Sequence, residues 1–264
     1  MKNNYLAGGS FDATIRIWNT DTGTLIRKLR GHTDSVNSLA VLKNGYLASG
    51  SADKTIRIWN IEDGSLLRKL SGHTDSVNSL AILKNDYLAS GSVDKTIRIW
   101  NIEDGSLLRT LAGHTEYVTS LAVLQNGYLA SASMDATIKI WNTDSGSLIK
   151  TLTGNCIPIS LVVLQNGYLA TGCLDNAIKI WDTDSDSLIR TLKGHIGMIF
   201  SLAVLKNGYL ASGSIDETIK IWNTDDGSLI TTLEHSGDVS TLAVLQNGYL
   251  VSGSQDNSII TIWN

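Results

Sequence analysis

Serine, histidine and aspartate recur together along the chain, and these residue types can build a triad for nucleophilic catalysis. Four Gly-His pairs are present, at Gly31-His32, Gly72-His73, Gly113-His114 and Gly194-His195. Each pair precedes a segment that begins Tyr-Leu-Ala, contains serine and leads to an aspartate. A catalytic site needs one singular arrangement, whereas this combination returns at a fixed place. The pattern therefore favours a structural role, and we expect no enzyme.

Other patterns that would carry chemistry are missing from the sequence. It contains no glycine-rich phosphate loop and no His/Cys cluster with metal-ligand spacing, so we expect no cofactor and no metal. Cys156 and Cys173 are the only cysteines and belong to the same stretch of chain. They could pair as a disulfide, but we expect two buried or idle thiols. Basic residues recur from Arg16 to Lys220, and we interpret this row as a solvated face.

Charge and composition exclude further function classes. The net charge of -4 gives no basic surface for nucleic acid. No run of 18 apolar residues is present, so we expect no membrane-spanning segment, and Met1 to Ala7 contain no apolar signal core. Two cysteines are too few for a disulfide framework, which favours a reducing compartment and a cytoplasmic location.

Tryptophan marks an internal repeat. The seven tryptophans are Trp18, Trp59, Trp100, Trp141, Trp181, Trp222 and Trp263. Their spacing is 41 residues, except for 40 between Trp141 and Trp181. The segment from Tyr46 to Asn60 returns almost unchanged from Tyr87 to Asn101. One structural unit has therefore been copied seven times.

Each unit has the two-residue period of β-strands. Val36–Leu42, Tyr46–Ser51, Thr55–Trp59 and Leu66–Leu70 read as four strands, named a, b, c and d. Asn44-Gly45, Asp53-Lys54 and Asp63-Gly64 are turn signals between them. A single four-stranded meander cannot bury both faces, but copies packed face to face in a ring can. We predict an all-β chain that forms one seven-bladed β-propeller over residues 1–264.

The chain resembles the WD-repeat propeller family. The Gly-His pairs and the closing Trp-Asn or Trp-Asp pairs match its repeat signature, although Trp-Asp occurs only at Trp181-Asp182. In that family many blades hold a buried hydrogen-bonded tetrad, and the resemblance places four here. They are His32, Ser49, Asp53 and Trp59; His73, Ser90, Asp94 and Trp100; His114, Ser131, Asp135 and Trp141; and His195, Ser212, Asp216 and Trp222. The fifth unit carries Asn155 in place of the histidine.

Apolar substitutions gather at one end of the fourth to sixth units. The d–a loop joins strand d of one unit to strand a of the next, and it shares this end with the b–c turn. Ser35 and Ser76 correspond to Tyr117 and Met198, and Asn37 corresponds to Phe200. The residues predicted to form an apolar patch are Tyr117, Met134, Leu174, Met198, Phe200 and Ile215. A contiguous apolar patch usually marks a binding surface, and in the family this face commonly takes partner peptides.

Drift among repeats is the alternative explanation of these substitutions. We expect a non-catalytic scaffold or adaptor that binds a protein or peptide on the face formed by the d–a and b–c loops. The rival interpretation is a truncated or excised sensor or regulatory repeat domain of a larger protein. Neither interpretation involves nucleic acid or a membrane.

The terminal units are incomplete. The first unit lacks strand a and the seventh lacks strand d, so one inner strand and one outer strand are missing. Unpaired strand edges can pair with another chain. We therefore also expect possible strand pairing at the open blade edges. Residues Asp256 to Trp263 contain one extra residue, which predicts a β-bulge.

Overall fold

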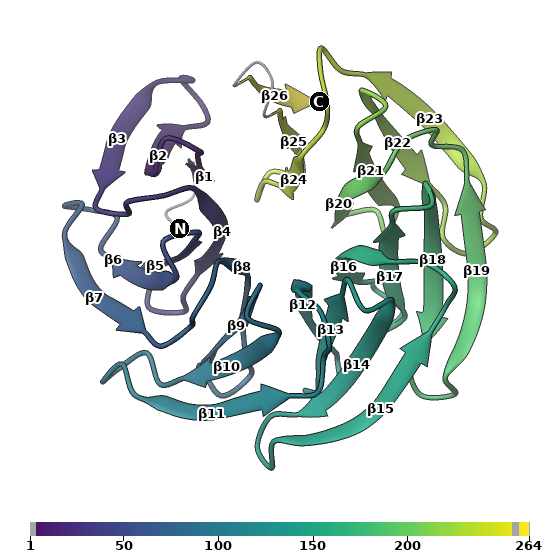
Figure 1. Ribbon diagram of the computed structural model, residues 1–264. Coiled ribbons are helices and arrows are strands. Elements are labelled where there is room, and N and C mark those ends of the chain that lie inside the picture. The colour runs from purple at the N-terminus through teal and green to yellow at the C-terminus, as the bar shows by residue number, and fades with distance from the viewer. Residues whose placement is uncertain (1–3, 255–258, 264) are drawn as a thin grey trace. The chain divides into compact units, whose positions relative to one another are not determined.

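The computed structural model describes residues 4–254 and 259–263, and these form β-strands without a helix. Accordingly, this part of the chain contains no helix long and apolar enough to cross a membrane. The strands form seven antiparallel sheets, each a meander of consecutive strands (Figure 1). The β-bulge predicted from Asp256 onward begins outside the described residues.

The strands of the first three sheets are β1 (Tyr5–Gly9), β2 (Thr14–Asn19), β3 (Leu25–Arg30), β4 (Val36–Val41), β5 (Leu47–Ser51), β6 (Thr55–Trp59), β7 (Leu66–Ser71), β8 (Val77–Ile82), β9 (Leu88–Ser92), β10 (Thr96–Trp100) and β11 (Leu107–Ala112). Those of the fourth and fifth sheets are β12 (Val118–Val123), β13 (Leu129–Ser133), β14 (Thr137–Asn142), β15 (Ser147–Thr153), β16 (Pro158–Val163), β17 (Leu169–Cys173), β18 (Ala177–Asp182) and β19 (Ser187–Lys193). Those of the last two are β20 (Ile199–Val204), β21 (Leu210–Ser214), β22 (Thr218–Trp222), β23 (Leu229–Glu234), β24 (Thr241–Val244), β25 (Leu250–Gly253) and β26 (Ile260–Trp263).

The observed strands follow the predicted pattern of a, b, c and d. The first and last sheets have three strands and the others have four, which confirms the expected missing strands. Boundaries differ by one residue: β4 ends at Val41 rather than Leu42, and β5 begins at Leu47 rather than Tyr46. These shifts lie where the Asn44-Gly45 turn takes over the backbone hydrogen bonds, with Leu42 N–H donating to the Tyr46 carbonyl.

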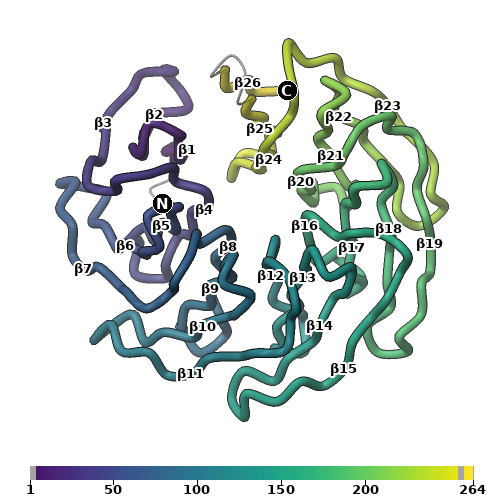
Figure 2. The backbone as a smooth tube through the Cα atoms, in the orientation of Figure 1, coloured from purple at the N-terminus to yellow at the C-terminus, as the bar shows by residue number. Residues whose placement is uncertain are grey.

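The chain groups into two compact units, and residues of the fourth sheet belong to both. Unit 1 comprises residues 1–123, 127–131 and 140–149, and unit 2 comprises the remainder. In unit 1 the first strand of each sheet lies against that of the next, as β4 does against β8. The chain then returns from the far edge of one sheet, β7, to begin the next at β8 (Figure 2). In unit 2, β16, β20 and β24 follow the same arrangement.

The core lies between consecutive sheets. Ile56 and Ile58 of β6 point to one face and, with Leu70, pack against Val77 and Trp100 of the next sheet. In unit 2, Ile178, Ile180 and Leu192 pack in the same way against Ile199 and Trp222. The two-residue period of strand c places both isoleucines on one face. Each sheet therefore buries its faces only through its neighbours.

Candidate protein-interaction surface

The predicted tetrad residues lie within hydrogen-bonding distance of one another in the second sheet. His32 Nδ1 is 2.7 Å from Asp53 Oδ2, and His32 Nε2 is 2.7 Å from Ser49 Oγ. Trp59 Nε1 donates to the same Ser49 Oγ at 2.8 Å. Four residues from the d–a loop, strand b, the b–c turn and strand c are thus joined in one chain of hydrogen bonds.

The equivalent residues of other sheets meet in the same way. In the third sheet His73 contacts Asp94 at 2.7 Å and Ser90 at 2.8 Å, and Trp100 donates to Ser90. In the sixth sheet His195 contacts Asp216 at 2.8 Å and Ser212 at 2.7 Å, and Trp222 donates to Ser212. In unit 1, His114 lies 2.7 Å from Ser131 Oγ, which also accepts from Trp141. Asp135 accepts from Thr137.

The proton order in the tetrad follows from the donors. Because Ser49 Oγ accepts the indole N–H, its own proton is available for His32 Nε2. The other ring nitrogen then carries the hydrogen and donates it to Asp53. Every polar group is satisfied when the imidazole is neutral. Burial likewise lowers the pKa of His32 below its ordinary 6.5, although Asp53 acts in the opposite direction.

The partner carboxylate is held in its charged form. Burial acts to raise the pKa of Asp53, but hydrogen bonds from Thr55, His32 and the Thr33 N–H outweigh it and place the pKa at about 2. In the sixth sheet burial likewise opposes, and hydrogen bonds from Thr218, Ile196 N–H and His195 outweigh it, so the pKa of Asp216 is lowered. The order of the bonds, carboxylate to imidazole to hydroxyl, is that of a catalytic triad. However, Ser49 is fully buried and its oxygen is shared with an indole, so no substrate can reach it.

The tetrad positions the loops at one end of the sheet. Asp53, in the b–c turn, accepts hydrogen bonds from both the side chain of His32 and the backbone of Thr33, in the d–a loop. Ser51 Oγ donates to the Asp34 carbonyl at 3.0 Å, and Ala52 N–H donates to the Ser35 carbonyl. The d–a loop and b–c turn therefore form one rigid surface. The exposed side chains of these two segments decide whether the surface is polar or apolar.

In the fifth and sixth sheets that surface is apolar. Leu174 N–H donates to the Ile157 carbonyl at 3.0 Å, and Ile215 N–H donates to the Met198 carbonyl at 3.1 Å. These pairs replace the Ser35–Ala52 pair of the second sheet. Leu174 and Met198 are half-buried, whereas Ile215 is 43% exposed. The structure thus brings four of the predicted apolar residues onto two adjoining sheets: Leu174, Met198, Ile215 and Phe200, the last of which lies in β20.

The fifth and sixth sheets pack closely beside these apolar positions. Gly172, two residues before Leu174, lies so close to Ile199 that an added Cβ would stand 2.7 Å from Ile199 Cγ2. Ile199 itself is flanked by Met198 and the half-buried Phe200. Of the remaining predicted residues, Met134 is half-buried in unit 2, and Tyr117 belongs to unit 1 and is 45% exposed. Their part in binding stays a prediction.

Sequence reasoning missed the most exposed apolar side chain of this surface. Ile196 is 86% exposed and lies in the d–a loop before Met198, where its N–H donates to Asp216. It stands at the position of Thr33 and Thr74, so comparison of the repeats could have found it. We define the apolar loop face by Ile157, Leu174, Ile196, Met198, Phe200 and Ile215.

A depression lies at the opposite end of the fifth and sixth sheets. It has a volume of about 360 Å³ and is lined by turn residues, including Gln165, Asn166, Asn207 and Asp225. These side chains are polar and carry no singular combination of catalytic groups. The depression therefore adds no chemistry to the site described above.

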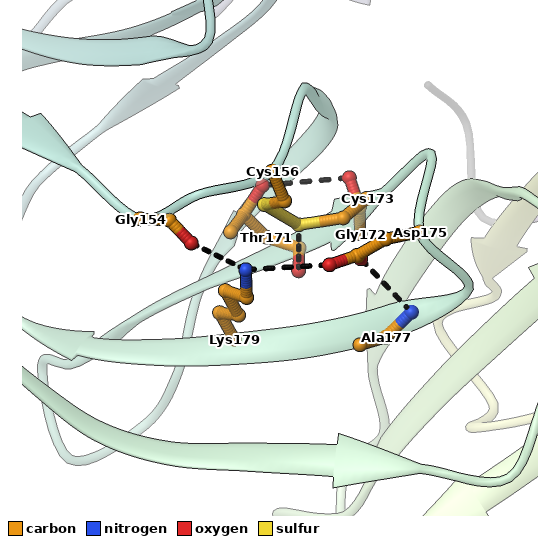
Figure 3. The surroundings of a disulfide bond; sticks show 8 residues. All are labelled: Gly154, Cys156, Thr171, Gly172, Cys173, Asp175, Ala177 and Lys179. Carbon is orange, nitrogen blue, oxygen red and sulfur yellow. Dashed lines mark hydrogen bonds and ion pairs between the residues drawn. A yellow bond between two sulfur atoms is a disulfide. The ribbon is translucent and has the colours of Figure 1, made fainter.

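Two expectations about the fifth sheet are wrong. Cys156 and Cys173 are not idle thiols but form a disulfide, with their Cα atoms 6.0 Å apart (Figure 3). Lys179, interpreted as part of a solvated row, is buried and donates to the Gly154 carbonyl. Lys179 makes this contact in a blade whose d–a loop is one residue shorter and lacks the histidine. Asp175 lies within 4.8 Å of both sulfurs, but a disulfide offers no thiolate for a metal.

Comparison with known proteins agrees with the repeat and the fold. The family model described as "WD domain, G-beta repeat" matches residues 2–19, 23–60, 64–101, 105–142, 146–182, 186–223 and 227–264. The Lissencephaly-1 homolog of Caenorhabditis briggsae is 50% identical over 36 residues, which make up 14% of this chain and 9% of that protein. Among solved structures, the WD40 β-propeller domain of Doa1 aligns with a TM-score of 0.89 at 28% identity, over 99% of this chain and 89% of that one.

These similarities identify each sheet as one blade of a propeller. The chain has the fold of a seven-bladed β-propeller, with three strands in the first and last blades and four in the others. The seven matched segments cover most of the sequence, so the chain belongs to the WD domain, G-beta repeat family.

Proposed function

We propose that this propeller is a protein-interaction scaffold that binds a protein or peptide partner on its apolar loop face. The observation that carries the proposal is the exposure of Ile196 and Ile215 in the d–a loop and b–c turn of one blade. Contiguous apolar surface of this kind marks interaction sites in soluble proteins. The second and third blades instead carry Ser35 and Ser76 where the sixth carries Met198.

The loop geometry supports a preformed binding surface. Ile196 N–H is held by Asp216 at 2.9 Å, and Asp216 is in turn held by His195. A Cβ at Gly197 would lie 2.5 Å from Ile215 Cγ2, so the glycine lets the loop pack closely under that side chain. A rigid surface loses little conformational entropy when a partner binds. The sixth-blade tetrad therefore serves the scaffold role by fixing the exposed isoleucines.

The partner can be identified by placing a photo-crosslinking amino acid at Ile196 and sequencing what it captures. Binding of the purified partner is then compared between Ile215→Glu and Ile230→Glu by calorimetry. Ile230 is the matched control, because it is 46% exposed in the same blade but lies on strand β23. We expect Ile215→Glu to weaken binding at least tenfold, since a buried isoleucine contributes about 1.5–3 kcal/mol. Equal affinities for the two variants would overturn the proposal.

The cytoplasmic location remains a prediction. The small number of cysteines favours it, whereas a disulfide such as that of the fifth blade is more common in oxidising compartments. Quantifying free thiols in protein isolated from its source cells under acid quench would test it.

A further inference from the structure

The disulfide of the fifth blade stands where other blades have a hydrogen bond. Ser51 Oγ, at the end of strand b, donates to the carbonyl of Asp34 in the d–a loop. The third blade repeats this bond between Ser92 Oγ and the Asp75 carbonyl at 3.1 Å. Cys173 and Cys156 occupy the equivalent two positions. A hydrogen bond between loop and strand has thus been replaced by a covalent bond that thiol chemistry can make or break.

The fifth blade lacks the side-chain hydrogen bonds of the tetrad that hold this loop in other blades. Asn155 replaces the histidine, and the side chain of Asp175 is 45% exposed, whereas that of Asp53 is almost fully buried. The buried indole N–H of Trp181 has no hydrogen-bond partner. Lys179 partly compensates by contacting the Gly154 carbonyl and, at 3.4 Å, Asp175 Oδ2 (Figure 3). The disulfide therefore joins this d–a loop covalently to the end of strand b, beside the hydrogen bond from Leu174 N–H to the Ile157 carbonyl.

We propose that Cys156 and Cys173 form a reversible thiol–disulfide switch that tethers or releases the d–a loop of the fifth blade. The cysteines directly precede Ile157 and Leu174 in the chain, so the switch controls how firmly this part of the apolar loop face is held. Its effect on partner binding rests on the proposed function, whereas loop release does not. Cys156 is the more accessible of the two, so exchange begins at its sulfur.

The exchange uses a small thiol such as glutathione. Its thiolate attacks Cys156 Sγ, the bond between the two protein sulfurs breaks, and Cys173 leaves as a thiolate that takes up a proton. A second thiol then attacks the glutathione sulfur of the mixed disulfide, which releases Cys156 and one glutathione disulfide. Two protein thiols are formed for two glutathione thiols oxidised, and oxidation by glutathione disulfide reverses both steps.

The test uses the full chain equilibrated at a series of ratios of reduced to oxidised glutathione. Thiols are trapped by alkylation, and hydrogen exchange is measured for peptides that cover residues 154–164 and 169–179. Constraining 17 residues of chain corresponds to about a hundredfold in an equilibrium constant. We therefore expect loop amides in the oxidised protein to exchange at least about tenfold more slowly than in the reduced protein. The matched control is Cys156→Ser combined with Cys173→Ser, which should show no redox response.

Two results would overturn the switch. One is thiols that are fully alkylated at every glutathione ratio, and the other is identical exchange in the oxidised and reduced proteins. Partner affinity in the two redox states tests the regulatory role separately. If the loop responds but affinity is unchanged, regulation of the face is refuted while the switch stands. If Ile215→Glu also leaves binding unchanged, the proposed function fails independently of the switch.

Discussion

Removal of one buried hydroxyl tests whether the tetrad stabilises the propeller. Ser90 is fully buried, accepts a hydrogen bond from Trp100 Nε1 at 2.8 Å, and lies 2.8 Å from His73 Nε2. Ser90→Ala therefore leaves two buried polar atoms without their partner. A buried group that loses its partner costs about 1–3 kcal/mol, so we expect the free energy of unfolding to fall by about 2–4 kcal/mol.

The fifth blade supplies a matched control. Thr171 occupies the position of Ser90 and is equally buried, but its hydroxyl makes only a 3.5 Å contact with the Gly172 carbonyl among the described bonds. The neighbouring Trp181 indole already lacks a partner. Thr171→Val removes the hydroxyl while keeping the shape, and we expect it to cost less than about 1 kcal/mol.

Urea denaturation followed by circular dichroism and by tryptophan fluorescence measures both variants. Coincident transitions by the two probes are required before free energies are compared, because repeat proteins can unfold in stages. Similar losses for Ser90→Ala and Thr171→Val would refute the reasoning. They would show that the hydroxyl at this position acts through packing rather than through the His73 and Trp100 hydrogen bonds.

Two further predictions concern acidification and close packing. The pKa values of His32 and His195 are lowered below 6.5, and that of Asp53 is lowered from 3.8 to about 2, so the unfolded chain binds more protons than the folded one. The free energy of unfolding should therefore be highest above about pH 7, fall as the pH drops below 6.5, and fall again between pH 3.8 and about 2. Urea midpoints that rise on acidification would contradict this. Gly91→Val should lower the free energy of unfolding by more than about 2 kcal/mol, because a Cβ there would stand 2.5 Å from Val118 Cγ1. Gly45→Ala, at φ 85° but with no atom within 4 Å of the added Cβ, should cost about 1 kcal/mol. Chemical denaturation should rank the two variants in that order.

Much of the fold could be predicted from the sequence because the same strand and turn pattern occurs in seven repeats. The two-residue period predicted a strand over Thr55–Trp59, and its Ile56 and Ile58 lie together in the core. The tetrad positions were carried over from the family resemblance, and their hydrogen bonds are local to one sheet. Such features depend on spacing along a single repeat, which a sequence displays directly.

The residues of the apolar loop face could be predicted only in part. Met198 and Ile215 stood out as departures from the repeat, and the structure joins them by a backbone hydrogen bond. Ile196 was overlooked, although its side chain is more exposed than that of Ile215. Its place at the position of Thr33 and Thr74 marks it as a departure from the repeat, but the extent of its exposure depends on the loop conformation, which the sequence does not show.

The repeat and the strand order could be predicted without a structure, as could the three-stranded first and last sheets, because they follow from the local period and the turn residues. The state of Cys156 and Cys173 and the burial of Lys179 depend on how the chain folds in space. Disulfide formation requires two Cα atoms at a suitable separation and side chains that point toward each other. That geometry arises from the d–a loop of the fifth blade folding against the end of strand β17, and a 17-residue spacing along the chain does not specify it.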